Sequence, residues 1–241
     1  MDKTTHLFSE WAGQIVTDFG KTGKIVVAWA MASMFKQKIE DYLGTFPALY
    51  LQGPWGVGKT ELGKAIVAMR RGIRMNYLYD KMQDIKHAAT EYPVVFLDDY
   101  RGLILDKVSE LCDNPKYPAA LVVAGQEFPD FFQMQKGITL RLQKRWAGDP
   151  YQIMDFADSI AKSGSMKESG INLQTQDLEQ YWREAVSHIP GQPRISLNMA
   201  ILPATFRALN GIPLAAFTYD ELLDACVESV NDLISVQKER S

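Results

Sequence analysis

Short apolar runs alternate with helical patterns through the middle of the chain. Apolar runs over residues 46–51, 94–97 and 119–124 are typical of buried parallel strands. Residues 73–79 predict a further strand by the alternation of Met75, Tyr77 and Tyr79, and the short stretch 151–154 is the candidate last strand. Amphipathic stretches between them predict helices over residues 61–71, 80–90 and 103–112. This alternation predicts an α/β fold with a five-stranded parallel sheet flanked by helices.

The two ends of the chain have helical patterns only. We expect a helix over 1–20, a break at Thr22-Gly23 and a longer helix from Lys24 to about Leu43. A polar, glycine-containing linker over 162–170 is followed by three more helical patterns, over 175–188, 194–209 (interrupted by Pro203) and 219–237. The sequence thus predicts an N-terminal helical segment (1–44), a core (45–160) and a small C-terminal helical lid (161–241).

One glycine-rich stretch matches the phosphate-binding P-loop pattern G-x-x-x-x-G-K-[ST]: it is Gly53-Pro54-Trp55-Gly56-Val57-Gly58-Lys59-Thr60. It follows an expected strand and opens an expected helix, which is the context that the motif requires. Glycines let backbone N–H groups turn toward phosphates, and a helix N-terminus adds partial positive charge. We expect Lys59 to reach the β- and γ-phosphates of ATP and Thr60 to hold Mg²⁺, with the other loop residues and Glu61 around the nucleotide.

Polar residues end the next two strands that a P-loop site would use. Asp98 and Asp99 follow the apolar run 94–97, about 40 residues after the P-loop. We expect Asp98 to hold Mg²⁺ directly or through water, and Asp99 to orient or deprotonate the attacking water. Gln126 follows the run 119–124 and is the candidate sensor of the γ-phosphate, unless it merely begins a loop.

Composition narrows the function classes. The chain has 241 residues and a formal net charge of −3, which argues against a broad nucleic-acid footprint but allows a few lysines in a narrow channel. Cys112 and Cys226 fit no metal-ligand spacing. No window approaches a membrane span, and we expect a cytoplasmic protein with no membrane partner.

The order of these features resembles an AAA+ ATPase. Gly191-Gln192-Pro193-Arg194 is similar to the second-sensor motif of that superfamily, which implies that Arg194 contacts the γ-phosphate from the lid. The stretch around Arg141, Lys144 and Arg145 resembles the arginine-finger box, with Arg145 the better match and Arg141 the alternative. In the family this finger enters the neighbouring subunit, so the resemblance implies a homo-oligomer, either a hexameric ring or a helical filament.

A narrower similarity points to the helicase motors of primase-helicase proteins from phages and mobile elements, grouped near superfamily 3 and the minichromosome-maintenance class. It lies in Ala48–Pro54, Val95–Arg101 and Val123–Glu127. The resemblance implies an oligomeric DNA helicase or translocase for replication, in a bacterium or a phage-infected cell. The alternative is an AAA+ loader, regulator or nucleotide switch that acts on a protein partner. A small-molecule P-loop kinase is the weakest hypothesis, because it needs no such helical lid.

Three further residues leave alternatives open. Lys81 and Lys116 are candidate pore-loop contacts to single-stranded DNA, and the alternative for each is the ordinary one of a solvated surface lysine. Trp55 either stacks in the nucleotide site or packs on a neighbouring subunit.

Overall fold

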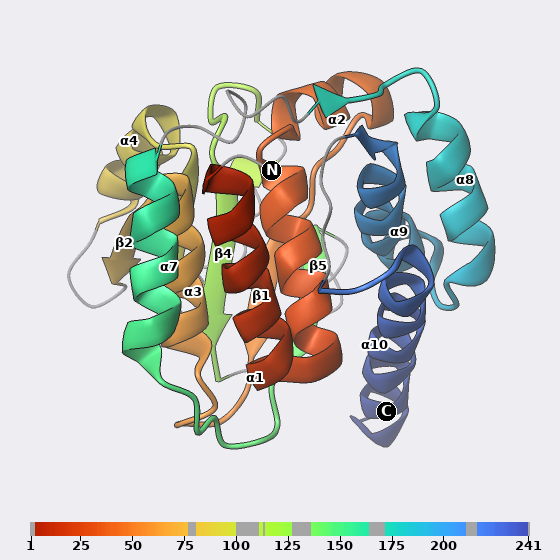
Figure 1. Cartoon of the computed structure of the whole chain (residues 1–241). Helices are drawn as coiled ribbons and strands as arrows, with labels where there is room; N and C mark the ends of the chain where they lie inside the picture. The colour runs from red at the N-terminus through yellow and green to blue at the C-terminus, as the bar shows by residue number, and fades with distance from the viewer. Residues whose placement is uncertain are drawn as a thin grey trace.

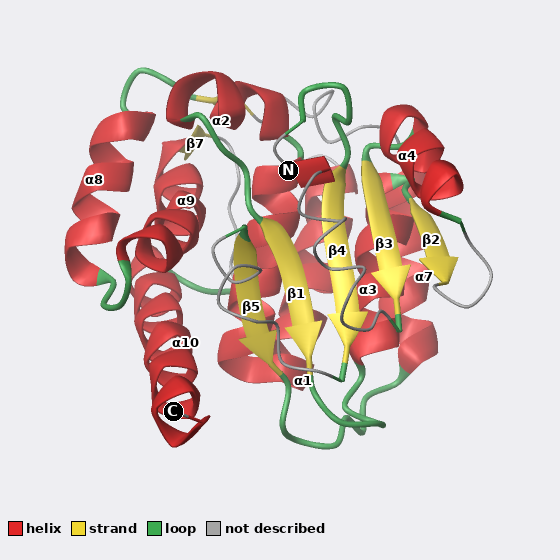
Figure 2. Ribbon diagram, turned by 180° about the vertical axis from the view of Figure 1, so that it is seen from behind, coloured by secondary structure: helices red, strands yellow, loops and turns green. Residues whose placement is uncertain are grey.

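A parallel sheet of five strands, in the order β2-β3-β4-β1-β5, lies at the centre of the molecule (Figure 2). The structure is a computed structural model that describes residues 3–76, 81–99, 111–112, 114–126, 136–163, 172–210 and 216–240. Its strands are β1 (Ala48–Gln52), β2 (Ile73–Asn76), β3 (Val94–Asp98), β4 (Ala120–Gly125) and β5 (Gly137–Arg141). The α/β fold and the five-stranded parallel sheet are therefore confirmed.

The fifth strand is not where we expected it. It is β5, which pairs in parallel with β1 and brings Arg141 opposite Gln52. Residues predicted as a strand, 151–154, instead belong to helix α7 (Pro150–Ser163). Ile153, Ala157 and Ile160 are buried, and their spacing of four and three residues is the period of one helix face.

Helices cover both faces of the sheet (Figure 1). On one face lie α1 (Lys3–Ser33), α3 (Lys59–Arg70) and α7, and on the other lies α4 (Met82–Glu91). Helix α3 approaches the sheet closely because Gly63 has no side chain: a Cβ there would lie 2.3 Å from the ring of Phe96 on β3. The expected helix over 103–112 lies outside the described residues except at its last two positions.

The N-terminal chain reverses direction at Gly20, not at the predicted break at Thr22-Gly23. Gly20 has φ 56° and ψ −129° inside α1, a conformation that glycine adopts without steric cost (Figure 1). Gly23 instead lets the second half of α1 pack closely on the first half, because a Cβ there would lie 2.4 Å from the carbonyl oxygen of Ile15. The second half of α1 ends at Ser33, and a separate helix α2 (Lys36–Leu43) follows, where we expected one continuous helix.

The C-terminal part is mostly helical, as predicted. It contains α8 (Leu178–His188), α9 (Pro193–Ala208) and α10 (Tyr219–Arg240), and α9 continues through Pro203 without a break. A small antiparallel pair that we did not expect joins β6 (Asn172–Leu173) to β7 (Leu209–Asn210), apart from the main sheet.

Apolar side chains of α1, α3, α7, α8, α9, α10 and one sheet face form one continuous hydrophobic cluster. The division at residues 44 and 160 stays a prediction, because this shared core crosses both boundaries. Within the described ranges, no helix has both the length and the apolar character needed to cross a membrane.

Candidate functional site

The loop between β1 and α3 encloses the site. Gly56 and Gly58 have φ of 80° and 86°, in the left-handed region that favours glycine. The first helical bond of α3 runs from the N–H of Leu62 to the carbonyl of Gly58. The amides before it have no acceptor within their own helix, which makes this end of α3 suited to an anion. The loop borders a pocket of about 360 Å³.

Lys59 bends back over the loop that carries it. Its Nζ donates to the carbonyl oxygens of Gly53 and Pro54, both at 2.7 Å. Partial burial lowers the pKa of Lys59 below its ordinary value, and the nearby carboxylates of Asp98 and Asp99 oppose that shift. Two neutral carbonyls thus hold the ammonium group at the pocket. An anionic acceptor would form stronger hydrogen bonds with it and could replace them.

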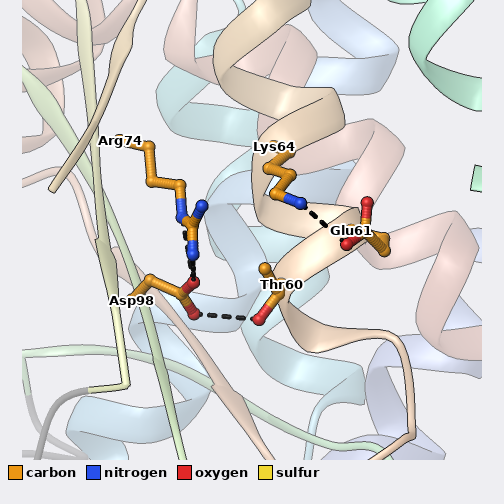
Figure 3. A network of polar contacts seen from close by, with 5 residues as sticks. All are labelled: Thr60, Glu61, Lys64, Arg74 and Asp98. Atoms are coloured by element: carbon orange, nitrogen blue, oxygen red, sulfur yellow. Dashed lines mark hydrogen bonds and ion pairs between the residues drawn. The ribbon is translucent and has the colours of Figure 1, made fainter. Parts of the chain in front are cut away.

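Asp98 connects three elements at the floor of the site (Figure 3). It ends β3 and is buried. Its Oδ1 accepts a hydrogen bond from Thr60 Oγ1 on α3 at 3.0 Å, and its Oδ2 accepts from Nε of Arg74 on β2 at 3.0 Å. A second donor of Arg74, Nη2, reaches the same Oδ2. Beside them, Glu61 pairs with Lys64 at 2.8 Å within α3.

Two other predicted residues reach the same pocket. Asp99 lines it with φ 58°, a left-handed conformation that costs a non-glycine residue of order 1 kcal/mol. Gln126 follows β4 and also lines the pocket, and its backbone carbonyl accepts a hydrogen bond from Nε2 of Gln52 at 2.9 Å.

The chemistry of Thr60 and Asp98 fits Mg²⁺. A hydroxyl and a carboxylate oxygen lie 3.0 Å apart, and Mg²⁺ prefers oxygen ligands of this kind, keeping several waters of its own. Within the described part of the chain, no group of three or more His, Cys, Asp or Glu side chains could hold a metal by itself. A metal here would therefore need ligands beyond the protein, such as phosphate oxygens and water.

Trp146 joins the glycine-rich loop to the N-terminal helix. Its backbone N–H donates to the carbonyl of Gly56 at 3.1 Å, and its indole N–H donates to Asp18 at 3.1 Å. Its ring stacks on Phe19, with centroids 5.8 Å apart. A Cβ on Gly58 would lie 3.0 Å from Trp146 and 3.1 Å from Phe19, so these rings pack directly on the loop.

The three predicted arginines lie outside the pocket lining. Arg141 is half-buried at the end of β5, whereas Arg145 and Arg194 are exposed. With the last strand expected over 151–154, Arg145 would have come just before it, and that placement is wrong. Arg145 follows β5 in a segment that runs beside the loop, because Leu142 N–H donates to the carbonyl of Gln52 and Trp146 N–H to that of Gly56.

The candidate DNA contacts lie in two different segments. Lys81 is exposed at the start of α4, and its backbone N–H donates to Asp84. Lys116 is exposed in the turn before β4, with its Nζ 5.9 Å from the ring centroid of Tyr117. Trp55 lines the pocket and is 72% exposed.

Sequence reasoning missed Arg74, Trp146 and the Asp18–Phe19 pair. A signal for Arg74 was present: in the strand Ile73–Asn76, the polar Arg74 and Asn76 alternate with apolar residues and share one face. Trp146 and Asp18 are 128 residues apart, and the local sequence around either residue does not predict their contact.

A solved helicase structure shares the fold of most of this chain. The structure described as "SCCmec type IV Cch - active helicase" matches with a TM-score of 0.62 and 9% sequence identity, over 88% of this chain and 48% of that chain. The chain thus spans about half the length of that helicase. The JCV helicase matches at a TM-score of 0.37 and 12% identity, over 96% of this chain and 67% of that one, which is too low to support an argument.

No protein-family model matches the sequence. No curated protein matches it either. The likeness to the Cch helicase therefore establishes a shared fold over most of the chain, at a sequence identity that does not extend to activity.

Proposed function

We propose that this chain is an ATP-hydrolysing P-loop motor of the AAA+ type that works as a homo-oligomer. The observation that carries the proposal is the 3.0 Å contact between Thr60 and Asp98 beneath the glycine-rich loop. Two residues 38 positions apart meet where a magnesium nucleotide would place its metal. The loop amides and Lys59 would then bind the phosphates, with Lys59 exchanging carbonyl partners for phosphate oxygens.

The roles of the remaining pocket residues follow from their positions. Thr60 and Asp98 would hold Mg²⁺, which supplies positive charge to the β- and γ-phosphates when bound. Asp99 would orient or deprotonate the attacking water, and Gln126 would contact the γ-phosphate. Arg194 would act at a lid interface with the nucleotide of the same subunit or its neighbour.

Arg145 is the proposed finger in trans, with Arg141 as the alternative. Its exposure suits a residue that must reach another subunit. Its position beside its own loop suits action within one subunit equally well. Whether neighbouring subunits complete each other's sites is therefore a separate question from nucleotide binding.

We propose DNA as the substrate of the motor, as a helicase or translocase in replication of a phage or mobile element. The fold shared with the Cch helicase supports this choice. The alternative is a loader, regulator or switch acting on a protein, and the net charge of −3 supports it. ATPase rates with and without single-stranded DNA separate the two. A DNA motor is stimulated, and its DNA binding weakens steeply with salt.

The nucleotide proposal has its own test. We expect Lys59→Ala to lose most of its affinity for a fluorescent ATP analogue. Asp99→Asn should keep that affinity and lose hydrolysis, because phosphate binding and water activation use different groups. If Asp99→Asn hydrolyses ATP at the wild-type rate, Asp99 is not the base and another carboxylate takes that role. Unchanged nucleotide affinity in Lys59→Ala would refute the site itself.

A further inference from the structure

Arg74 and Asp98 form an ion pair inside the proposed metal site (Figure 3). Strands β2 and β3 pair in parallel with Asn76 opposite Asp98, so the Arg74 side chain extends forward along the sheet to the carboxylate. The Asp98 side chain is 6% exposed, whereas that of Arg74 is 41% exposed and lines the pocket. The carboxylate is thus fixed and the guanidinium can reach the open space of the pocket.

Both carboxylate oxygens of Asp98 already have partners. Oδ1 accepts from Thr60 and Oδ2 accepts from two nitrogens of Arg74. A divalent cation between Thr60 and Asp98 would compete with the guanidinium for the same carboxylate and would lie within a few ångströms of its positive charge. At such distances in a partly buried site, the solvent screens the repulsion between two positive charges only in part.

We propose that Arg74 is a competing cation that neutralises Asp98 in the nucleotide-free protein and moves onto the nucleotide phosphates when Mg²⁺ takes Asp98. This proposal rests on the proposed function. Metal alone binds weakly, because it must displace Arg74 with nothing to receive the guanidinium. Metal with nucleotide binds well, because the phosphates supply Arg74 with a new anionic partner in the same pocket. Arginine suits this exchange, since its planar fork fits carboxylate and phosphate alike.

The first measurement uses metal without nucleotide. Mn²⁺ prefers the same oxygen ligands as Mg²⁺, and electron paramagnetic resonance reports its free concentration. Arg74→Gln should bind Mn²⁺ about tenfold more tightly than the wild type, which corresponds to roughly 1.4 kcal/mol. Arg183→Gln removes an equal charge from an exposed ion pair on α8 and should leave Mn²⁺ affinity unchanged. Equal Mn²⁺ affinity in Arg74→Gln and the wild type overturns the proposal.

The second measurement uses a fluorescent ATP analogue with and without Mg²⁺. Arg74→Gln should bind the magnesium nucleotide about tenfold more weakly, while Arg183→Gln matches the wild type. Unchanged nucleotide affinity in Arg74→Gln removes the phosphate half of the proposal. If the wild type binds no nucleotide, the proposed function fails, and the Mn²⁺ comparison still decides whether Arg74 competes with metal.

Arg74→Lys keeps the charge and provides a variant that is closer to native should the glutamine variant not fold. It should bind Mn²⁺ within threefold of the wild type, because a cation still opposes the metal. It should bind magnesium nucleotide severalfold more weakly, because an ammonium group lacks the planar fork. Mn²⁺ binding tenfold tighter than the wild type in Arg74→Lys would refute charge competition.

Discussion

Replacing Gly58 by alanine should separate two physical costs in the glycine-rich loop. Gly58 has φ 86° at the start of α3, and its Cα lies against the rings of Trp146 and Phe19. Gly56 has a similar φ of 80°, but nothing lies within 4 Å of a Cβ built there. Alanine at either position meets the same backbone strain, and only alanine at Gly58 also meets packed neighbours.

The magnitude follows from these two terms. A left-handed alanine costs about 1–2 kcal/mol, and the gain from a less flexible unfolded chain is common to both variants. Overpacking adds about 1–3 kcal/mol at Gly58, because a Cβ contact at 3.0 Å requires the rings to move. We expect the free energy of unfolding to fall by about 2–5 kcal/mol in Gly58→Ala and by about 1–2 kcal/mol in Gly56→Ala.

Urea unfolding followed by circular dichroism measures this difference. With a slope near 3 kcal/mol per molar urea, an extra 2 kcal/mol lowers the midpoint by about 0.7 M relative to Gly56→Ala. Equal midpoints in the two variants would show that Trp146 and Phe19 do not hold the loop, and the proposed link between α1 and the site would fail.

Other perturbations test the sheet, the core and the assembly. Gly63→Ala should lower the free energy of unfolding by about 3 kcal/mol, since the new methyl would meet the buried Phe96 ring. Thermal unfolding measures this effect, and an unchanged melting temperature would show that α3 moves away from the sheet at no cost. Burial raises the pKa of the Cys226 thiol, so with the other cysteine replaced by serine it should resist Ellman's reagent at pH 8 until urea unfolds the chain. Above the ordinary thiol pKa, the unfolded chain loses a proton that the folded chain keeps. The contribution of Cys226 to stability therefore falls as pH rises. Mixing inactive Arg145→Ala with inactive Lys59→Ala should restore part of the ATPase activity if the finger acts in trans, whereas a mixture that stays inactive supports action beside its own loop.

Most of the sheet could be predicted because buried parallel strands are continuous apolar runs. The last strand could not be placed with the same rule. Residues 151–154, apolar except for Gln152, are too short a stretch to distinguish a strand from one turn of a helix, and only the later Ala157 and Ile160 complete the helical period. The true strand, Gly137–Arg141, carries β-branched residues that favour it but lies next to charged positions that we interpreted as a finger.

Some residues of the site could be predicted from local sequence patterns, and others could not. Lys59, Thr60 and Asp98 belong to local patterns that have a chemical purpose, and the structure brings them together. The contact of Arg74 with Asp98 can be predicted only once the pairing of β2 with β3 is known, because that pairing brings the two residues together. The turn at Gly20 could not be told from one at Gly23, since both glycines break a helix and only tertiary contact decides which one bends.

The reversal of α1 has a practical meaning for dissecting the molecule. Its first half contributes Phe8, Trp11 and Ile15 to the interior, each fully buried, and its turn presents Phe19 to the glycine-rich loop. Each such apolar side chain stabilises the fold by about 1.5–3 kcal/mol. A fragment that began at the glycine-rich motif would therefore lose buried core side chains of α1, and the smallest fragment that folds must include this helix although no motif lies in it.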